Sequence, residues 1–182
     1  MNWLNHFIFA ISGCLLFIPL SLINILLIIL FSLIFGILID YDHKFNKKAP
    51  WYHKRTWIQE PFGFLIIGLP LSFILGKIDK IFFILVLIPY ASHIFLDYLC
   101  IFETYPLAPF LKIKKKEGLG IFIPDNLFIK SENTQKWARR VREKNIKGIS
   151  ENYFTLFNLI FLIIVVFVKL ISTSSCHHFT SF

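Results

Sequence analysis

Five long runs of apolar residues, separated by short polar or charged segments, dominate the pattern along the chain. They cover roughly residues 4–18, 20–39, 62–76, 81–102 and 153–172. Uncharged runs of this kind are typical of transmembrane helices, because about 20 helical residues cross a hydrocarbon core of ~30 Å. The runs 4–18 and 62–76 are short, which also fits tilted spans, half-helices or re-entrant segments. The pattern predicts an all-α, polytopic helical membrane protein with four to five transmembrane segments.

The composition supports one integral membrane domain over residues 1–182. Hydrophobic residues make up 56% of the chain and charged residues only 16%. A soluble domain of this length has too little interior to hide so much apolar surface. The charged residues are also clustered between the apolar runs, where a membrane protein needs them.

The basic residues lie almost entirely in two of these segments. Five follow the second run: Lys44, Lys47, Lys48, Lys54 and Arg55. Eleven follow the fourth run: Lys112, Lys114, Lys115, Lys116, Lys130, Lys136, Arg139, Arg140, Arg142, Lys144 and Lys147. If all five runs cross the membrane, both segments lie on one side, and the excess of Lys and Arg places that side in the cytoplasm. We expect a multi-pass protein of the cell membrane whose N-terminus and basic loops are cytoplasmic.

The net charge of +8 comes mostly from the second basic segment, the loop 103–152. Clusters of Lys and Arg next to a membrane segment bind anionic lipid headgroups. We therefore expect membrane lipids as partners, with anionic headgroups at this loop. We expect no nucleic acid, and the sequence leaves the oligomeric state open.

Most of the histidines and nearly half of the acidic residues gather at the cytoplasmic side in this topology. Four of six histidines and five of eleven acidic residues lie there: His6, Asp40, Asp42, His43, His53, Glu60, His93, Asp97 and Glu103. Ionisable residues in or against a membrane are costly and usually mark a functional site. His177 and His178 lie in a polar tail at the opposite face, where we expect no role for them.

Two spacings within this set favour metal binding. His93 and Asp97 are four residues apart and share one helix face, and the segment 40–43 offers two carboxylates and an imidazole at a helix end. Such ligands suit a divalent metal ion, Zn²⁺ first, with Mn²⁺ or Fe²⁺ as alternatives. The predicted ligands are His6, Asp40, Asp42, His43, His53, His93 and Asp97. One metal with outer carboxylates and two metals bridged by an aspartate both fit this number.

Each element taken alone also has a structural interpretation. His93 and Asp97 fit a hydrogen bond inside a helical bundle, and the segment 40–43 fits a solvated helix end. His6 fits an interfacial side chain, and His53 fits an aromatic belt formed with its neighbours. It is their convergence on one side that favours a common site.

The order of these residues resembles that of the membrane-bound, metal-dependent hydrolases of the YdjM-like family. The matching elements are Asn5-His6, Gly36 followed by Asp40-Tyr41-Asp42-His43, His53-Lys54-Arg55-Thr56, Ser92-His93-Ile94-Phe95-Leu96-Asp97 and Pro109-Phe110. The resemblance covers roughly residues 1 to 110. It implies a membrane-bound hydrolase that uses a divalent metal, and it implies no particular substrate.

The chain departs from the family pattern at two places. Ile39 stands where the family often has Pro, and the second histidine expected after His53 is absent. Ile58, Gln59 and Glu60 occupy that neighbourhood instead. Either Glu60 replaces the missing histidine as a ligand or base, or this chain has lost part of the site.

These observations predict a metal-dependent hydrolase at the cytoplasmic membrane face, acting on a lipid ester or phosphoester. Glu60 or Glu103 is the candidate catalytic base, and Lys54 and Arg55 are candidates for binding an anionic group, since Arg pairs with phosphate oxygens through two N–H groups. Two alternatives stay open. One is a non-catalytic membrane protein whose His/Asp cluster is a structural metal or polar site. The other is a small metal or proton transporter.

Overall fold

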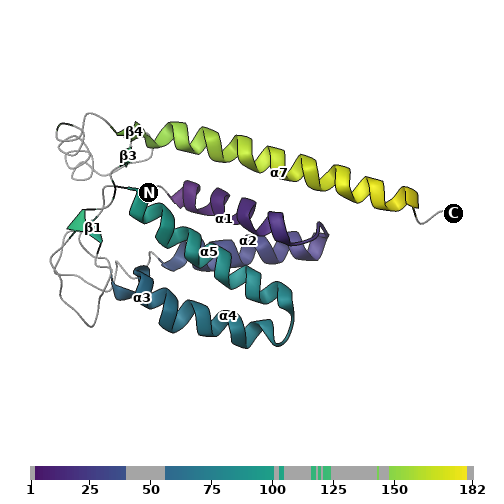
Figure 1. Ribbon diagram of the computed structural model, residues 1–182, viewed down its shortest axis with the longest axis horizontal. Coiled ribbons are helices and arrows are strands. Elements are labelled where there is room, and N and C mark those ends of the chain that lie inside the picture. Colours follow the sequence, from purple (N-terminus) through teal and green to yellow (C-terminus); the bar gives the residue numbers. More distant parts are fainter. Residues whose placement is uncertain are drawn as a thin grey trace.

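The computed structural model describes residues 3–39, 56–100 and 148–179, together with 103–104, 116–117, 119, 121–123 and 143. Its main helices are α1 (Trp3–Phe17), α2 (Leu22–Gly36), α5 (Lys80–Leu99) and α7 (Glu151–Phe179). Between α2 and α5 lie a 3₁₀ turn, η3 (Trp57–Gln59), and one apolar helix. This helix begins as α3 (Pro61–Gly63), continues as the π-helical η4 (Phe64–Gly68) and ends as α4 (Leu69–Gly76). Each of the five apolar runs is therefore helical, as predicted (Figure 1).

Local sequence explains where these helices begin and end. Pro19 lies two residues after the end of α1. The Ser21 hydroxyl caps α2 by accepting a hydrogen bond from the Asn24 amide at 3.2 Å. Asp79 caps α5 in the same way, since its carboxylate accepts from the Ile81 amide at 2.9 Å. These caps satisfy amide groups that would otherwise lack partners at a helix start.

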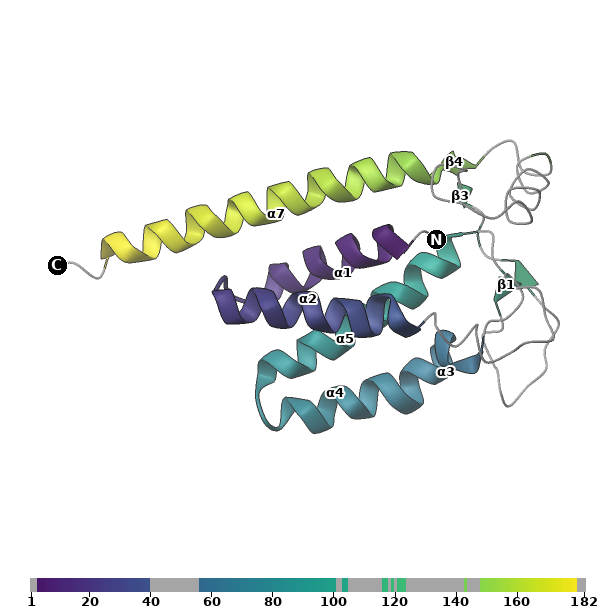
Figure 2. The ribbon, with the colours of Figure 1, turned by 180° about the vertical axis from the view of Figure 1, so that it is seen from behind.

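Helix α5 is the centre of the bundle. It packs against α1, α2 and α4, while α7 packs along α1 on the outside (Figures 1 and 2). A core cluster joins four of these helices through Cys14, Leu15, Ile28, Leu85 and Val165. Residues from both ends of the chain thus share one core.

The distribution of polar and apolar side chains is the reverse of that in a soluble protein. Large apolar side chains of α2 and α7 are exposed, with Leu22 at 77% and Ile163 at 66%, whereas Asn5, His6 and His93 are fully buried. Contiguous exposed apolar surface of this extent is costly in water, and it is what lipid contact requires. The outer surface of the described helices therefore suits a membrane.

Two of the helices are long and apolar enough to cross a membrane. They are α5, with 20 residues, and the first 22 residues of α7, Glu151–Ser172. The apolar helices Trp3–Phe17, Leu22–Gly36 and Pro61–Gly76 are shorter, and 15 residues extend only about 22 Å. Helix length thus supports two spans, and the predicted total of four to five stays a prediction.

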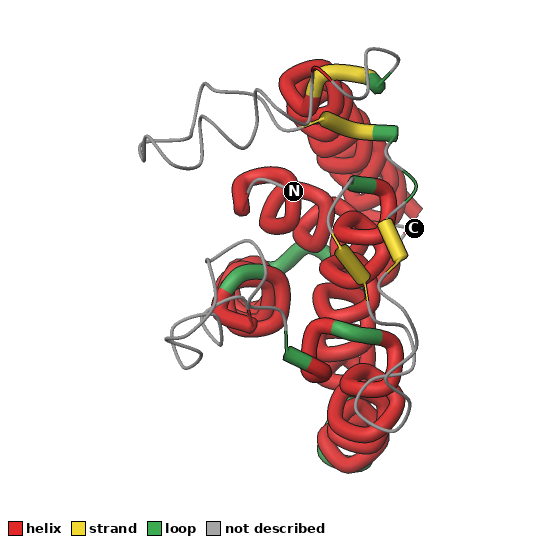
Figure 3. The backbone as a smooth tube through the Cα atoms, turned by 90° about the vertical axis from the view of Figure 1, so that its left-hand side faces the viewer, coloured by secondary structure: helices red, strands yellow, loops and turns green. Residues whose placement is uncertain are grey.

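Four two-residue strands, which the all-helical prediction did not include, lie in the region expected as a loop. β1 (Glu103–Thr104) pairs antiparallel with β2 (Lys116–Glu117), and β3 (Phe122–Ile123) pairs parallel with β4 (Ile149–Ser150). Amides of this region donate to the last carbonyls of α5: Leu119 to Tyr98 at 2.9 Å and Ile121 to Leu99 at 3.0 Å. Because these carbonyls have no partners within the helix, the strands cap this end of the bundle, which faces the viewer in Figure 3.

Candidate functional site

A buried polar cluster lies at the end of the bundle where the strands pack. It is formed by the first turns of α1 and α7, the last turns of α2 and α5, and the 57–60 segment, all of which meet at the end marked N in Figure 1. Alternating helix direction explains this meeting, because successive helices enter and leave at opposite ends of the bundle. Of the residues predicted to converge, His6, His93 and Asp97 lie together among the described residues; those predicted from the second run lie outside them.

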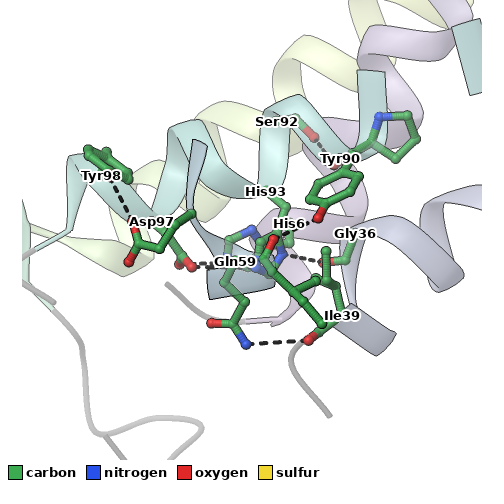
Figure 4. A network of polar contacts seen from close by, with 12 residues as sticks. His6, Gly36, Ile39, Gln59, Tyr90, Ser92, His93, Asp97 and Tyr98 are labelled. Carbon is green, nitrogen blue, oxygen red and sulfur yellow. Dashed lines mark hydrogen bonds and ion pairs between the residues drawn. The ribbon is translucent and has the colours of Figure 1, made fainter. Parts of the chain in front are cut away.

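Asp97 faces the edges of two stacked histidine rings in this cluster (Figure 4). Its Oδ1 is 3.2 Å from His6 Nε2, and its Oδ2 is 3.4 Å from His93 Nε2. The two imidazole rings stack with centroids 4.3 Å apart. Both histidines are fully buried and Asp97 is 5% exposed, so water contributes little to solvating their charges.

The backbone of α2 determines which nitrogen of His93 faces Asp97. His93 Nδ1 lies 3.0 Å from the Gly36 carbonyl oxygen. A carbonyl can only accept, so Nδ1 carries the proton, and Nε2 of a neutral ring then presents a lone pair toward the carboxylate. Two acceptors at 3.4 Å repel unless a proton or a metal cation lies between them. The same backbone contact orients histidines that bind metals.

The buried imidazole of His6 also lies close to the carboxylate of Asp97. Neither of its ring nitrogens makes a hydrogen bond with the described residues, although Nε2 is close to the Asp97 carboxylate. Buried polar atoms normally have partners. Protonating both histidines would place two stacked positive rings against one carboxylate, leaving an uncompensated buried charge. The single carboxylate therefore balances one added positive charge and not two.

The observed separations are those of hydrogen bonds or ion pairs, and they are also close to the separations between ligand atoms of one tetrahedral metal ion. Tetrahedral coordination at about 2.0–2.1 Å from the metal places neighbouring ligand atoms roughly 3.3–3.4 Å apart, close to the 3.2 and 3.4 Å found here. Within the residues that the structure describes, however, no group of three or more His, Cys, Asp or Glu side chains could hold a metal ion. Metal binding by His6, His93 and Asp97 therefore stays a prediction.

The 57–60 segment brings Glu60 to the same end of the bundle. Glu60 is 1% exposed, and its Oε2 accepts a hydrogen bond from the Tyr98 hydroxyl at 2.7 Å. The Tyr90 hydroxyl donates to the Ile58 carbonyl at 2.6 Å, so α5 holds this segment at two points. Glu60 therefore lies beside the last turn of α5, the turn that also carries Asp97.

Gln59 connects this segment to the end of α2. Its Nε2 donates to the Ile39 carbonyl at 3.3 Å, and the side chain is fully buried. Ile39 is the last described residue before Asp40. The chain thus leads directly from the cluster into the predicted ligands Asp40, Asp42 and His43.

A second buried polar contact joins α1 to α7. Asn5 donates to Glu151 Oε1 at 3.3 Å, and Asn158 donates to Asn5 Oδ1 at 3.4 Å. All three side chains are buried. Neither Glu151 nor the two asparagines were among the predicted site residues. The signal was present, because amide side chains inside apolar runs are typical of contacts between membrane helices.

The structure does not test the roles predicted for the other site residues. Glu103 lies in β1, whose backbone pairs with Glu117 of β2. The predicted ligands and cationic residues of the first basic segment lie outside the described residues: Asp40, Asp42, His43, His53, Lys54 and Arg55. The roles assigned to all of these residues stay predictions.

These features define a helical membrane protein with a buried His/Asp cluster at one end of its bundle. Residues 1–174 match the family described as YdjM inner membrane protein, and the chain belongs to this family. The resemblance seen in the sequence is thereby confirmed at the level of the family, whose description mentions neither hydrolysis nor a metal. No curated protein and no solved structure gave a match.

Proposed function

We propose that this inner-membrane protein is a metal-dependent hydrolase with its centre at His6, His93 and Asp97. The observation that carries the proposal is the geometry of His93, whose Nδ1 is fixed by the Gly36 carbonyl and whose Nε2 faces Asp97 at 3.4 Å. This arrangement needs a proton or a metal cation between the two groups, and it leaves the histidine oriented to bind a metal. Asp40, Asp42 and His43 would complete the ligand set, with His53 as a further candidate.

The metal would be divalent, with Zn²⁺ preferred over Mn²⁺ or Fe²⁺. When bound, it would supply Lewis-acid activation of water or of an ester oxygen. Glu60 is the candidate base, because its carboxylate is buried at the same end of the bundle and is oriented by the Tyr98 hydroxyl. Glu103 is the alternative base.

The proposed substrate is a lipid ester or phosphoester. The apolar outer surface supports a position of the bundle in the bilayer, and the end of the bundle that carries the cluster would then lie near headgroup depth. Lys54 and Arg55 precede the 57–60 segment in the sequence and would bind an anionic headgroup. In the proposed multi-pass topology, this end, the N-terminus and both basic segments are cytoplasmic.

One observation favours a second candidate function. His6 and His93 are fully buried, and a closed cluster suits a structural metal or polar contact that holds α1, α2 and α5 together. Such a protein would be non-catalytic. The two candidates differ in whether exchangeable metal and turnover are present.

The first test of the proposal is the metal content of the purified protein. Detergent-purified wild type, a His93→Ala/Asp97→Ala variant and a His177→Ala/His178→Ala control would be analysed by mass spectrometry for Zn, Mn and Fe. The proposal expects stoichiometric metal in the wild type and the control, and a loss of at least tenfold in the cluster variant. A wild type that stays metal-free after reconstitution with each ion would overturn the metal-dependent function and leave a polar packing cluster.

The second test is enzymatic turnover, which distinguishes the hydrolase from a protein with a structural metal. Metal-loaded protein would be tested on lipid carboxylic esters and lipid phosphoesters. Glu60→Gln should keep its metal while losing activity, because it changes the base and leaves the ligands intact. Bound metal without turnover on either substrate class would favour the structural candidate.

A further inference from the structure

The two histidines of the cluster differ in how their rings are held. His93 is oriented by the Gly36 carbonyl oxygen, which lies 3.0 Å from its Nδ1. Neither ring nitrogen of His6 makes a hydrogen bond with the described residues. The direction of the His6 ring therefore depends on its stacking against His93 and on where the first turn of α1 places it.

The neighbouring residue Asn5 ties this turn of α1 to the start of α7. Its Nδ2 donates to Glu151 Oε1 at 3.3 Å, and its Oδ1 accepts from Asn158 at 3.4 Å. Asn5 and Asn158 are fully buried and Glu151 is 6% exposed, so these hydrogen bonds are shielded from water. Because Asn5 and His6 are consecutive, a displacement of Asn5 also moves His6.

The start of α7 is in turn fixed to the end of α5 that carries Asp97. Glu151 directly follows β4, and the Ile149 amide of β4 donates to the Ile121 carbonyl at 2.8 Å. The Ile121 amide donates to the Leu99 carbonyl at 3.0 Å, in the last turn of α5. Backbone hydrogen bonds thus connect Glu151 to the turn that carries Asp97 without passing through α1 (Figure 1).

Aromatic contacts join the same elements. The ring of Phe122 in β3 lies 4.5 Å from that of Phe154 in α7, measured between centroids, and Phe154 lies 6.4 Å from Phe9 in α1. Phe9 also stacks on Phe95 of α5 at 6.4 Å. The strands, α7, α1 and α5 therefore form a closed ring of contacts at the end of the bundle where the His/Asp cluster lies.

We propose that Glu151 is a positioning residue, whose carboxylate holds Asn5 and thereby keeps His6 directed at Asp97. The core contacts of α1 with α7 are apolar, as between Leu15 and Val165, and apolar contacts have no preferred direction. A hydrogen bond between buried groups is directional, so it fixes the first turn of α1 more closely than packing does. The role deepens the proposed function and rests on it for metal binding, whereas the position of His6 can be measured without a metal.

Chemical modification of the histidines tests this proposal. Diethylpyrocarbonate acylates accessible imidazoles, and its reaction with the chelator-treated full chain in detergent would be followed residue by residue by mass spectrometry. Glu151→Ala should raise the modification rate of His6 by roughly fivefold, the factor expected when one buried hydrogen bond is lost. His93 should stay protected, because it keeps its own contact with Gly36.

Glu151→Gln is the matched control. Its side-chain amide oxygen can still accept the hydrogen bond from Asn5, so His6 should keep its wild-type rate. Because Glu151→Ala could disturb α7 itself, Asn5→Ala removes the same hydrogen bond from the α1 side and should expose His6 equally. Unchanged protection of His6, equal exposure of His93, or exposure of His6 in Glu151→Gln would each overturn the positioning role.

Metal affinity separates this inference from the proposed function. In a wild type that binds metal, Glu151→Ala should weaken the affinity roughly 10–100-fold, as loss of a residue that orients a ligand does, and Glu151→Gln should not. Unchanged affinity in Glu151→Ala would overturn the positioning role. A wild type that binds no metal would overturn the proposed function alone, and the modification rates of His6 and His93 would still decide the role of Glu151.

Discussion

Gly63 is the position where a single methyl group should displace part of the candidate site. A Cβ added there would lie 2.4 Å from the Ile58 carbonyl oxygen and 2.5 Å from that of Trp57. The backbone of Gly63 is ordinary right-handed helix, with φ −60° and ψ −42°. Glycine is therefore needed for space and not for conformation, because the 57–60 segment lies directly against the start of the helix.

The cost of Gly63→Ala follows from these contacts. Reaching ordinary contact at 3.4 Å from 2.4 Å requires a shift of 1.0 Å, and the obstructing atoms are backbone. Overpacking of this kind costs about 1–3 kcal/mol, and loss of the Tyr90 hydrogen bond to Ile58 would add about 0.5–1.5 kcal/mol. Alanine recovers up to about 1 kcal/mol of helix propensity. We expect a net destabilisation of about 1–3 kcal/mol.

Gly36→Ala is the matched control. There an added Cβ would meet Ala10 Cβ at 3.6 Å and the His6 carbonyl at 3.7 Å, which are ordinary contacts, and the carbonyl that binds His93 is kept. Free energies of unfolding would be measured by SDS titration in mixed micelles, followed by circular dichroism. Gly63→Ala should lose stability and Gly36→Ala should keep it. Equal stability of Gly63→Ala and wild type, or equal damage in both variants, would refute the reasoning.

Three further predictions concern the site, the α1–α7 contact and the topology. Tyr98→Phe removes the donor to Glu60 and should lower turnover roughly 10–100-fold while metal content is unchanged; loss of metal would contradict this. Asn5→Ala removes two interhelical hydrogen bonds and Asn158→Ala only one. SDS titration should therefore show the larger loss of unfolding free energy for Asn5→Ala, at about 0.6 kcal/mol per bond. Equal losses in the two variants would argue against a shared role of Asn5. Alkaline phosphatase fused after Asp79 should be active and after Lys130 inactive, because the enzyme works only outside the cytoplasm; the reverse pattern would invert the proposed topology.

The pattern of apolar residues was sufficient to predict the positions of the helices and the meeting of His6, His93 and Asp97. The expected runs and the observed helices begin within a few residues of each other, since the caps Ser21 and Asp79 limit where helices begin. The largest difference is at the end of α7, which continues to Phe179 and not to residue 172. The meeting of His6, His93 and Asp97 followed from the alternation of helix direction. Whether each short helix spans the membrane depends on tilt and on lipid, which the pattern does not encode.

Several contacts could not be predicted from the residues alone. The acceptor for His93 is the carbonyl of Gly36, and any residue offers a carbonyl, so the sequence carries no signal for it. The Glu60–Tyr98 bond depends on how the 57–60 segment folds against α5. The two-residue strands depend on pairing between segments far apart in the chain, which local propensity does not determine.

The contact of Asn5 with Glu151 and Asn158 has a consequence for how the protein is made. These partners are separated by 146 and 153 residues, so α1 is synthesised long before α7 exists. During that interval the amide of Asn5 lacks the partners it has in the finished bundle, and water or lipid headgroups at this end of the bundle must solvate it instead. The arrival of the last helix replaces those contacts with two buried hydrogen bonds. A chain truncated before α7 would therefore expose this amide, which distinguishes unfinished molecules from complete ones.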